Sequence, residues 1–391
     1  MPTILIIGGG IGGLATAACL QVRGIPSIIY ERAAELREVG AALALWPNAM
    51  RVLKKLGVLQ HLADRAHVPP AGVLRDWRGR ELIHMVSMKT DVPTTFAHRA
   101  DLHGALLTAI PPHTLHLNKA ATAVERREHQ IRATFSDGTT SDWADGLIAA
   151  DGIRSILREA TLHDGPPIYR GYIAWRGVAT FESPDIVGES WGPRGQRFGF
   201  IPLGRGRIGW WATANKPGNT SAETCAHSQA EWKRELIQRY AGWHHPIPQV
   251  IESTPEPAII CNPIMDRVPI KRPWGQGPMT LLGDAAHPTT PNLGQGACMA
   301  IEDAAVVAHA LAGIPDIAQA FRVYESTRFS RTARIMRESL KLGALGQWNS
   351  PLACGVRNFI MRHSPSRGVE RSISELWSYD AWETPLIVTP S

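Results

Sequence analysis

Short apolar runs alternate with a helix-length segment at the start of the chain. Residues 4–7 form an apolar run, residues 14–23 have the composition of a helix that ends at Gly24, and residues 28–30 form a second run. Two short apolar runs joined by one helix are typical of neighbouring parallel strands in an α/β sheet. The pattern therefore predicts an α/β fold that begins with a Rossmann-like unit.

The pattern changes between residues 166 and 273, where short segments alternate apolar and polar positions. Residues 169–177, 197–202 and 207–212 are examples, with glycine-rich turns near them. Alternation with a period of two predicts strands that bury one face. Large aromatic residues in such strands usually belong to the core, but they can also line a flat apolar pocket.

A strand, a loop and a long helix are predicted around residues 279–311. The apolar run 279–282 stops at Gly283-Asp284, a proline-rich loop follows, and Gly294-Gln295-Gly296 begins a helix with small residues on its inner face. Asp284 is placed to accept hydrogen bonds from ligand hydroxyls, while free N–H groups at the helix start supply partial positive charge. Such a site suits a polyol chain that ends in a ring able to carry negative charge. In the alternative interpretation, Asp284 only caps the helix.

The segment 315–345 predicts a further long helix. It carries four arginines at three-residue spacing, which is typical of a solvated face: Arg328, Arg331, Arg334 and Arg337. The tail from residue 346 predicts one or two short helices.

A glycine-rich turn follows the first apolar run directly. Its G-x-G-x-x-G spacing includes Gly8, Gly10, Gly12 and Gly13, and Glu31 ends the second apolar run about twenty positions later. Glycines permit a tight turn and close approach of the backbone to a pyrophosphate at the helix start, and the acidic residue binds a ribose hydroxyl. The turn predicts dinucleotide binding, although it does not separate NAD from FAD.

Three separate motifs resemble those of single-component FAD-dependent aromatic hydroxylases of the salicylate and p-hydroxybenzoate hydroxylase type. They are the glycine turn, Asp151-Gly152, and the stretch with GDAAHP (283–288), PNLGQG (291–296) and AIEDA (300–304). They occur in the order of that family. The resemblance runs from residue 2 to about residue 340.

The resemblance implies a set of residues that hold FAD. Ala42 and Leu43 would pass beside the flavin ring, Arg99 would reach the phosphates and the ribitol, and backbone near Ala121 would touch the adenine side. Asp151 would contact FAD and NAD(P)H, or it would be a plain helix cap. Arg51 is either a surface charge or a cofactor contact. The complete set is Gly8, Gly10, Gly12, Gly13, Glu31, Arg32, Ala42, Leu43, Arg99, Ala121, Asp151, Asp284, Pro291, Leu293, Gly294, Gln295 and Gly296.

The resemblance also implies the domain organisation. Residues 1–72, 98–165 and 274–345 would form a discontinuous Rossmann-like FAD-binding domain, within which residues 115–119, 121–126 and 131–135 form an inserted strand group. Residues 73–97 and 166–273 would form an inserted mixed β-sheet that binds the substrate. Residues 346–391 would be a C-terminal helical segment.

The implied activity is that of an NAD(P)H- and FAD-dependent monooxygenase. In the family, NAD(P)H reduces FAD, O₂ adds to give a flavin C4a-hydroperoxide, and one oxygen atom passes to an aromatic carbon. Because the chain has one glycine turn of this kind, NAD(P)H would reach a flavin ring that swings outward, past small residues from Gly40 to Ala42. The alternatives are a flavin-dependent epoxidase, a halogenase or other flavoprotein oxidoreductase, and a non-catalytic FAD-binding protein. The W-x-W-x-I segment expected of a halogenase is not found.

The residues of the substrate pocket follow from the facing that the family gives to strand 197–201. Arg197, Gly199 and Ile201 would face the flavin, with Gly209 and Trp211 on the neighbouring strand and Asn292 from the helix side. The two glycines would widen the pocket, and Arg197 would serve one phenolate, ketone or carboxylate. We therefore expect a phenolic, quinoline-like or fused-ring substrate. Asn292 and Gly209 stand where urate hydroxylases carry Asp and Tyr, and Ala44 where the hydroxypyridine branch carries His, so no catalytic base is assigned.

Composition limits the remaining classes of function. The net charge of +6 over 391 residues suits small anionic ligands, but the basic residues are dispersed, which argues against nucleic acid. The five cysteines show no C-x-x-C spacing and predict neither a disulfide framework nor a zinc site, so no metal is expected and a reducing cytoplasm is the simplest setting. No apolar run reaches the roughly 18 residues expected of a membrane span. A monomer or homodimer is expected.

Overall fold

The computed structural model describes residues 2–36, 41–63, 66–68, 71–86, 90–182, 186–218, 225–364 and 367–388. Its first layer is a parallel sheet in the order β17-β11-β1-β2-β8, and every neighbouring pair is parallel. The strands are β1 (Ile4–Ile7), β2 (Ser27–Tyr30), β8 (Leu115–His116), β11 (Gly146–Ala149) and β17 (Met279–Leu281). All residues of the three strands β1, β11 and β17 are buried, as expected for strands covered on both faces, while β2 and β8 at one edge are partly buried. The predicted α/β fold with a Rossmann-like sheet is confirmed.

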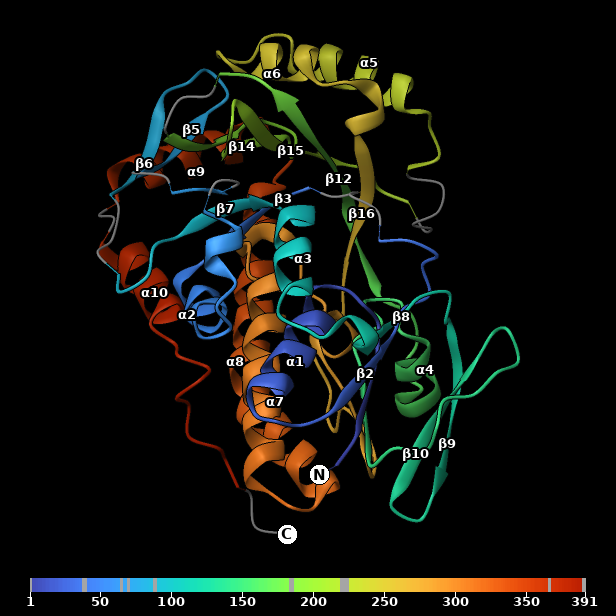
Figure 1. The fold of residues 1–391 in the computed structure, drawn as a ribbon. Coiled ribbons are helices and arrows are strands. Elements are labelled where there is room, and N and C mark those ends of the chain that lie inside the picture. The colour runs from blue at the N-terminus through green and yellow to red at the C-terminus, as the bar shows by residue number, and fades with distance from the viewer. Residues whose placement is uncertain are drawn as a thin grey trace.

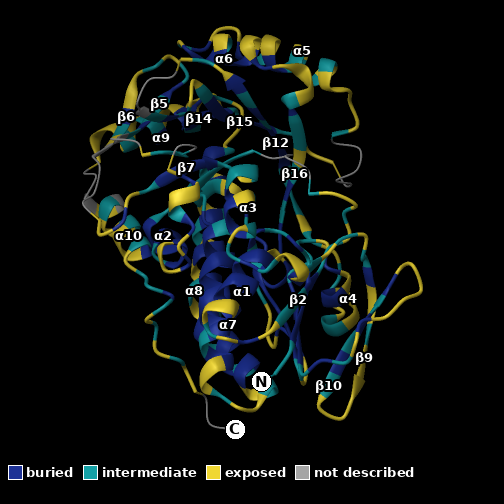
Figure 2. Ribbon diagram, in the orientation of Figure 1, coloured by how far each residue is buried: buried dark blue, intermediate teal, exposed yellow. Residues whose placement is uncertain are grey.

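Long helices cover this sheet (Figure 1). Helix α1 (Ile11–Val22) packs on α7 (Gly296–Gly313), and α7 packs on α8 (Ile317–Gly346). Helix α7 is long and apolar enough to cross a membrane, contrary to the expectation that no run reaches this length. Its residues are mostly buried inside the protein (Figure 2), as in the core helix of a globular domain.

The strands after residue 115 divide differently from the prediction. Leu115–His116 joins the parallel sheet as β8, whereas β9 (Ala121–Arg127) and β10 (Gln130–Phe135) form a separate antiparallel hairpin. The prediction of one inserted strand group was wrong, because the sequence pattern of a strand does not show which other strand it pairs with. Helix α4 (Ile156–Leu162) lies beside this hairpin (Figure 1).

A second, larger sheet combines strands from two distant parts of the chain. Its order is β16-β12-β15-β14-β13-β5-β6, and β13 pairs in parallel with β5 while the other pairs are antiparallel. The strands are β5 (Ala71–Asp76), β6 (Glu81–Val86), β12 (Ile168–Thr180), β13 (Ile186–Trp191), β14 (Arg197–Gly204), β15 (Arg207–Asn215) and β16 (Ile260–Asp266). This is the mixed sheet that the alternating pattern and the resemblance predict.

The outer face of this sheet is covered by two helices, α5 (Gln229–Tyr240) and α6 (Ile247–Ser253), at the top of Figure 1. Trp175, Phe198 and Trp210 pack there against residues such as Tyr240 and Ile251. Most large aromatics of the sheet are therefore core, which leaves the opposite face for a ligand.

A small three-stranded sheet lies between the two large ones. It consists of β3 (Ala42–Leu45), β7 (Thr95–His98) and β4 (Ala66–His67), and it is followed by α2 (Pro47–Lys55) on one side and α3 (Arg99–Leu107) on the other. The positions of Ala42 and Arg99 in space are fixed by this β3–β7 pairing. Gly40 lies outside the described residues.

The arginine row of α8 is not a solvated face throughout. Arg328 is completely buried and binds Glu302 and Asp303 of α7, and Arg331 also binds Glu302. Only Arg334 and Arg337 are exposed. The prediction was wrong for the first two arginines because their acidic partners belong to another helix.

The C-terminal tail folds into two helices, α9 (Pro351–His363) and α10 (Arg367–Trp377). They return to the body of the protein beside β6 and α2 (Figure 1). Arg51 of α2 donates hydrogen bonds to the carbonyl oxygens of Trp377 (2.5 Å) and Tyr379 (3.2 Å) and pairs with Asp91. Arg51 thus anchors the tail, a role that neither interpretation of it had included.

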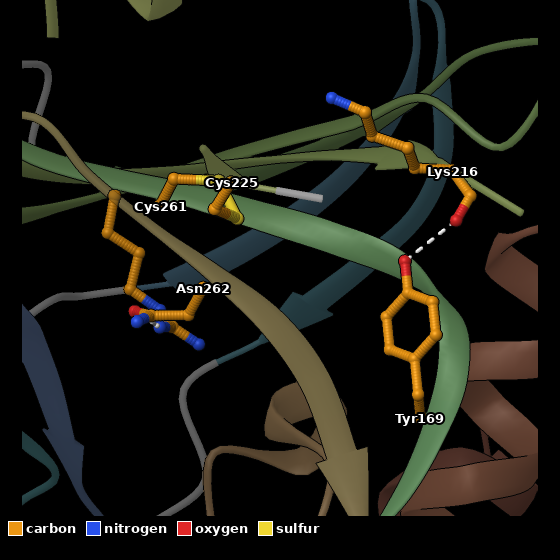
Figure 3. The surroundings of a disulfide bond; sticks show 6 residues. Tyr169, Lys216, Cys225, Cys261 and Asn262 are labelled. Atoms are coloured by element: carbon orange, nitrogen blue, oxygen red, sulfur yellow. Dashed lines mark hydrogen bonds between the residues drawn. A yellow bond between two sulfur atoms is a disulfide. The ribbon is translucent and has the colours of Figure 1, made fainter. Parts of the chain in front are cut away.

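Two cysteines form a disulfide, contrary to the sequence prediction. Cys225, before α5, bonds to Cys261 on β16, which pairs with β12 (Figure 3). They are 36 residues apart in the sequence, which is not a short local spacing, and the fold brings them together. Cys19, Cys298 and Cys354 are free and buried.

Candidate functional site

The glycine turn has the backbone geometry that only glycine allows. Gly8 has a φ of +110°, and a Cβ on Gly13 would lie 1.9 Å from the Gly8 carbonyl oxygen. Helix α1 then begins at Ile11 without a side-chain cap. Its first N–H groups are therefore available to an anion.

Glu31 holds this turn from the end of β2. Its carboxylate accepts hydrogen bonds from the backbone N–H of Gly9 (2.6 Å) and of Ala33 (2.9 Å). Arg32 beside it is exposed, and Ala121 begins β9 after a segment that is hydrogen-bonded to Glu31 through Lys119.

Asp151 lies before α4, whose N-cap is Ser155 and not Asp151. One carboxylate oxygen of Asp151 accepts a hydrogen bond from Ile156 N–H (3.1 Å) in the first turn of α4, while the other, Oδ1, is buried without a hydrogen-bond partner in the described structure. Burial raises the pKa of Asp151, although these hydrogen bonds oppose the rise. A buried acceptor without a donor beside the Gly8 turn indicates a ligand hydroxyl or amine.

A second helix start faces the same space. The 3₁₀ turn Pro291–Leu293 and Gly294, with a φ of +63°, lead into α7, which also has no side-chain cap. The Asn48 side chain donates to Gln295 Oε1 (3.0 Å), and the Trp46 indole donates to the Gly294 carbonyl (3.1 Å). Two uncapped helix starts, those of α1 and α7, therefore lie in one wall.

Asp284 and Arg99 lie between these two helix starts. Asp284 lies in the 3₁₀ turn Gly283–Ala285 and is open to the cavity. Desolvation by the surrounding protein raises the pKa of its carboxyl group, and the positive charges of His287 and Arg99 oppose this rise. The Arg99 guanidinium is exposed in the same space, 4.0 Å from the position of a Cβ on Gly10. It has no acceptor among the described residues. This cation is well placed for a phosphate.

Asp303 of the AIEDA motif is hydrogen-bonded to the turn that carries Asp284. Asp303 accepts hydrogen bonds from Gly283 N–H (3.1 Å) and Arg328 (2.6 Å), and His287 lies 2.6 Å from it. Burial alone would raise the pKa of Asp303, but His287 and Arg328 outweigh it and lower the pKa. Asp303 therefore fixes the 283–287 turn, while Ala300, the first residue of the motif, lines the cavity.

One cavity of about 1610 Å³ joins these groups to the large sheet, which is more than the usual volume of a small-molecule site. The floor is formed by residues that the sequence singled out: Gly10, Gly12, Ala42, Leu43, Arg99, Asp284, Pro291, Asn292, Leu293, Gly294, Gln295 and Gly296. Arg197, Ile201 and Trp211 line the opposite wall. The residues Glu31, Arg32, Ala121 and Asp151 are not part of this lining, and of these Glu31 and Asp151 lie next to the glycine turn.

The two glycines of the sheet do not widen this cavity. A Cβ on Gly209 would lie 2.2 Å from the Ala42 Cβ, and one on Gly199 would lie 2.1 Å from the Trp211 indole. The predicted facing of β14 and β15 agrees with the structure, since Phe198 and Trp210 pack in the outer core. The prediction that these glycines widen the pocket was wrong, because Ala42 and Trp211 already fill the space beside them.

Arg197 is not free to bind a substrate anion. Its Nε donates to Glu189 (2.7 Å) and its Nη1 to Asn292 Oδ1 (2.6 Å), while Asn292 also binds Tyr172 and Ser339. Glu189, on β13, lines the cavity and neutralises Arg197. The sequence analysis missed Glu189, although its place in an alternating segment was a possible signal.

The C-terminal tail also reaches the cavity. Ile373, Leu376 and Trp377 of α10 line it, and Trp377 stacks on Trp46 with ring centroids 4.9 Å apart. No local pattern in the sequence indicated this, because the tail returns over a distance of more than 300 residues.

A family described as FAD binding domain matches residues 1–339. The chain belongs to this FAD-binding family. Among curated proteins, it is 39% identical to the aurachin C monooxygenase/isomerase of Stigmatella aurantiaca, over 94% of this chain and 96% of the relative. It is 34% identical to the 6-hydroxynicotinate 3-monooxygenase of Bordetella bronchiseptica, over 86% of this chain and 90% of that protein.

Solved structures agree with the family. Klebsiella pneumoniae HpxO in complex with FAD and uric acid superposes with a TM-score of 0.88 at 26% identity, over 96% of both chains. A salicylate hydroxylase substrate complex has the same fold, with a TM-score of 0.78 at 22% identity over 97% of this chain and 96% of that one. The resemblance found from the three motifs is thereby confirmed.

Proposed function

We propose that the protein is an FAD-dependent monooxygenase that hydroxylates an aromatic small molecule with NAD(P)H and O₂. The observation that carries the proposal is one continuous cavity. Two uncapped helix starts, Arg99 and Asp284 form one wall, and a mostly apolar sheet face forms the other. The FAD-binding family and the monooxygenases among its relatives support it.

The residues present fit FAD. The α1 start and Arg99 would hold the pyrophosphate, Glu31 the ribose, and Asp284 the ribitol hydroxyls. Asp151 Oδ1, which has no donor in the described structure, provides a further acceptor next to the glycine turn. The α7 start would stabilise negative charge on the ring, which would lie beside Ala42 and Leu43. Bound FAD supplies the activation of O₂.

We extend the proposal to NAD(P)H as the source of electrons. The sequence contains one glycine turn of this kind between a strand and a helix. In this proposal the turn and Glu31, which binds Gly9 N–H, hold the FAD, so no second turn is left for NAD(P)H. The nicotinamide would therefore enter the same cavity, in agreement with its large volume. The choice between NADH and NADPH is an outcome of the assay below.

The pocket favours a planar aromatic with little charge. Ile201, Trp211 and Val187 supply apolar surface, and the Arg197 charge is satisfied by Glu189. Arg176 of β12 also lines this wall, and its Nη1 donates to Asn262 Oδ1 (3.0 Å) instead of to a carboxylate. A substrate with several anionic groups would lose hydration that this one cation cannot compensate. A phenolic, quinoline-like or fused ring is the best match.

Spectroscopy and turnover test the proposal in two steps. We expect the purified protein to retain FAD, to oxidise NADH or NADPH faster when a hydroxylated aromatic is present, and to incorporate one ¹⁸O atom from ¹⁸O₂ into the product. A protein that takes up FAD but shows no aromatic-stimulated turnover over a broad panel would contradict the monooxygenase assignment. A protein that cannot take up FAD would contradict the cofactor.

A further inference from the structure

Exposed apolar side chains gather on one helix of the C-terminal tail. Among the described residues, five of the twelve large exposed hydrophobics lie on or next to α9: Trp348, Leu352, Val356, Phe359 and Ile360. Leu352 is 80% exposed and Phe359 is 65% exposed. Single exposed hydrophobics are ordinary, but a cluster of this kind marks an interaction surface.

These side chains form one stripe. Residues 352, 356, 359 and 360 follow the spacing that places side chains on the same side of a helix. The inner side of α9 is firmly seated: Cys354 and Arg357 are buried, Arg357 donates to the Leu345 carbonyl (3.0 Å), and its guanidinium lies 4.9 Å from the Trp191 ring centre. The stripe is therefore an outer face, and α9 does not need it to dock on the protein.

The exposed charge of α9 itself is basic. Between Glu338 and Glu370 the sequence contains Lys341, Arg357, Arg362 and Arg367 and no acidic residue, and of these Arg357 is buried on the inner side. The exposed Glu81 of β6, beside α9, is paired with Arg75. Arg362 and His363, at the end of α9, are exposed. An apolar stripe with Trp and Phe, bordered by basic residues, is the composition of a helix that lies in the interface of an anionic membrane.

We propose that α9 docks the protein on an anionic lipid surface, with the apolar stripe in the headgroup region and the basic side chains against the lipid charges. A second copy of the chain is a poorer occupant, because a symmetric contact through this face would bring two basic borders together. Met361 of α9 and Ile373 of α10 line the large cavity, so the docked face adjoins one end of the candidate site. The docking itself does not depend on the proposed chemistry.

Vesicle co-sedimentation tests the docking without any assay of turnover. We expect the full-length protein to bind vesicles of phosphatidylcholine and phosphatidylglycerol, to bind phosphatidylcholine vesicles less, and to lose binding as salt increases. The double variant Leu352→Ser/Phe359→Ser should reduce the partition coefficient by about tenfold or more. The control Val22→Ser/Ile237→Ser, which changes exposed hydrophobics on α1 and α5, should bind as the unchanged protein does.

Thermal unfolding and sedimentation velocity accompany the binding assay. If the double variant does not fold, the single variant Leu352→Ser replaces it, since this side chain is the most exposed of the stripe. Absence of binding to anionic vesicles, or equal binding by the folded α9 variant, would overturn the proposal. The proposal would also be overturned if the unchanged protein were a dimer, the α9 variant were a monomer, and neither of them bound vesicles.

Discussion

At the scale of single residues, close packing gives several small side chains their role. Gly209 is small because Ala42 occupies the position of its Cβ, and Ala42 is itself part of the cavity floor. Strand β15 of the large sheet and strand β3 beside the expected flavin position therefore meet at this contact. A glycine in a site can mark a filled space as well as an open one.

Gly209→Ala should destabilise the protein by about 1–3 kcal/mol through overpacking, and it should weaken FAD binding because β3 must move. The control is Gly104→Ala on α3, where a Cβ would meet nothing within 4 Å. That change should be neutral or stabilising by about 0.5–1 kcal/mol. Urea unfolding and FAD titration measure both effects, and equal behaviour of the two variants would contradict the packing argument.

Glu31→Ala should weaken FAD binding by about 1–3 kcal/mol, because it removes a ribose acceptor and the brace on Gly9 N–H. Glu31→Gln keeps one acceptor oxygen and should lose less. Equilibrium titration of the apoprotein with FAD measures the difference. Unchanged affinity in the alanine variant would contradict a contact between Glu31 and the FAD ribose.

At the scale of elements, α10 closes part of the cavity wall from the far end of the chain. Trp377 stacks on Trp46, whose indole donates to the Gly294 carbonyl at the α7 start. The helix is held by Arg51 on one side and by Arg331, which donates to the Leu376 carbonyl (2.9 Å). Helices α2, α8 and α10 thus fix one another around the candidate ring site.

Trp377→Ala should increase the rate of FAD loss by about 2- to 10-fold, the range for removal of one aromatic pair. It should also lower the yield of hydroxylated product per NAD(P)H, because the wall opens to water. Trp382→Ala, in the tail beyond α10, is the matched control. Identical FAD dissociation and coupling in both variants would exclude a role for α10 at the site.

At the scale of the whole molecule, a buried ionic cluster joins α7, α8 and the Asp284 turn. Glu302 and Asp303 share the completely buried Arg328, and Asn48 connects Glu302 to Gln295 at the helix start. Burial raises the pKa of Glu302, but Arg331 and Arg328 outweigh it and lower the pKa. A group whose pKa is lowered by folding stabilises the fold above its unfolded pKa and loses that contribution as the pH falls through its folded pKa.

Stability should therefore be retained from neutral pH to about pH 4 and fall below it. Arg328→Met should cost about 3–5 kcal/mol at neutral pH, because two buried carboxylates lose their main partner, and it should move acid unfolding to higher pH. Urea unfolding at several pH values measures both. Arg334→Met, in an exposed pair with Glu338, should leave the pH profile unchanged, and a parallel shift in both variants would argue against the cluster.

The sequence alone determined the local geometry and the class of protein. The turn at Gly8, the strand before it and Glu31 after it could be predicted because each depends on backbone conformation and spacing over a few residues. The facing of Arg197 and Ile201 came from the resemblance to the family, because a period of two gives the alternation of side chains but not the face that meets the cavity. Three motifs in order sufficed for the FAD-binding family.

Only the tertiary structure decided which groups meet across the chain. Arg328 is buried because Glu302 and Asp303 come from another helix, Arg197 is neutralised by Glu189 from another strand, and Cys225 meets Cys261. Periodicity describes one element and carries no information about the partner that covers it. Long-range contacts of this kind include the charge pairs, the filled glycine positions and the return of the tail to the cavity. They are set by the packing of distant elements and not by spacing along the sequence.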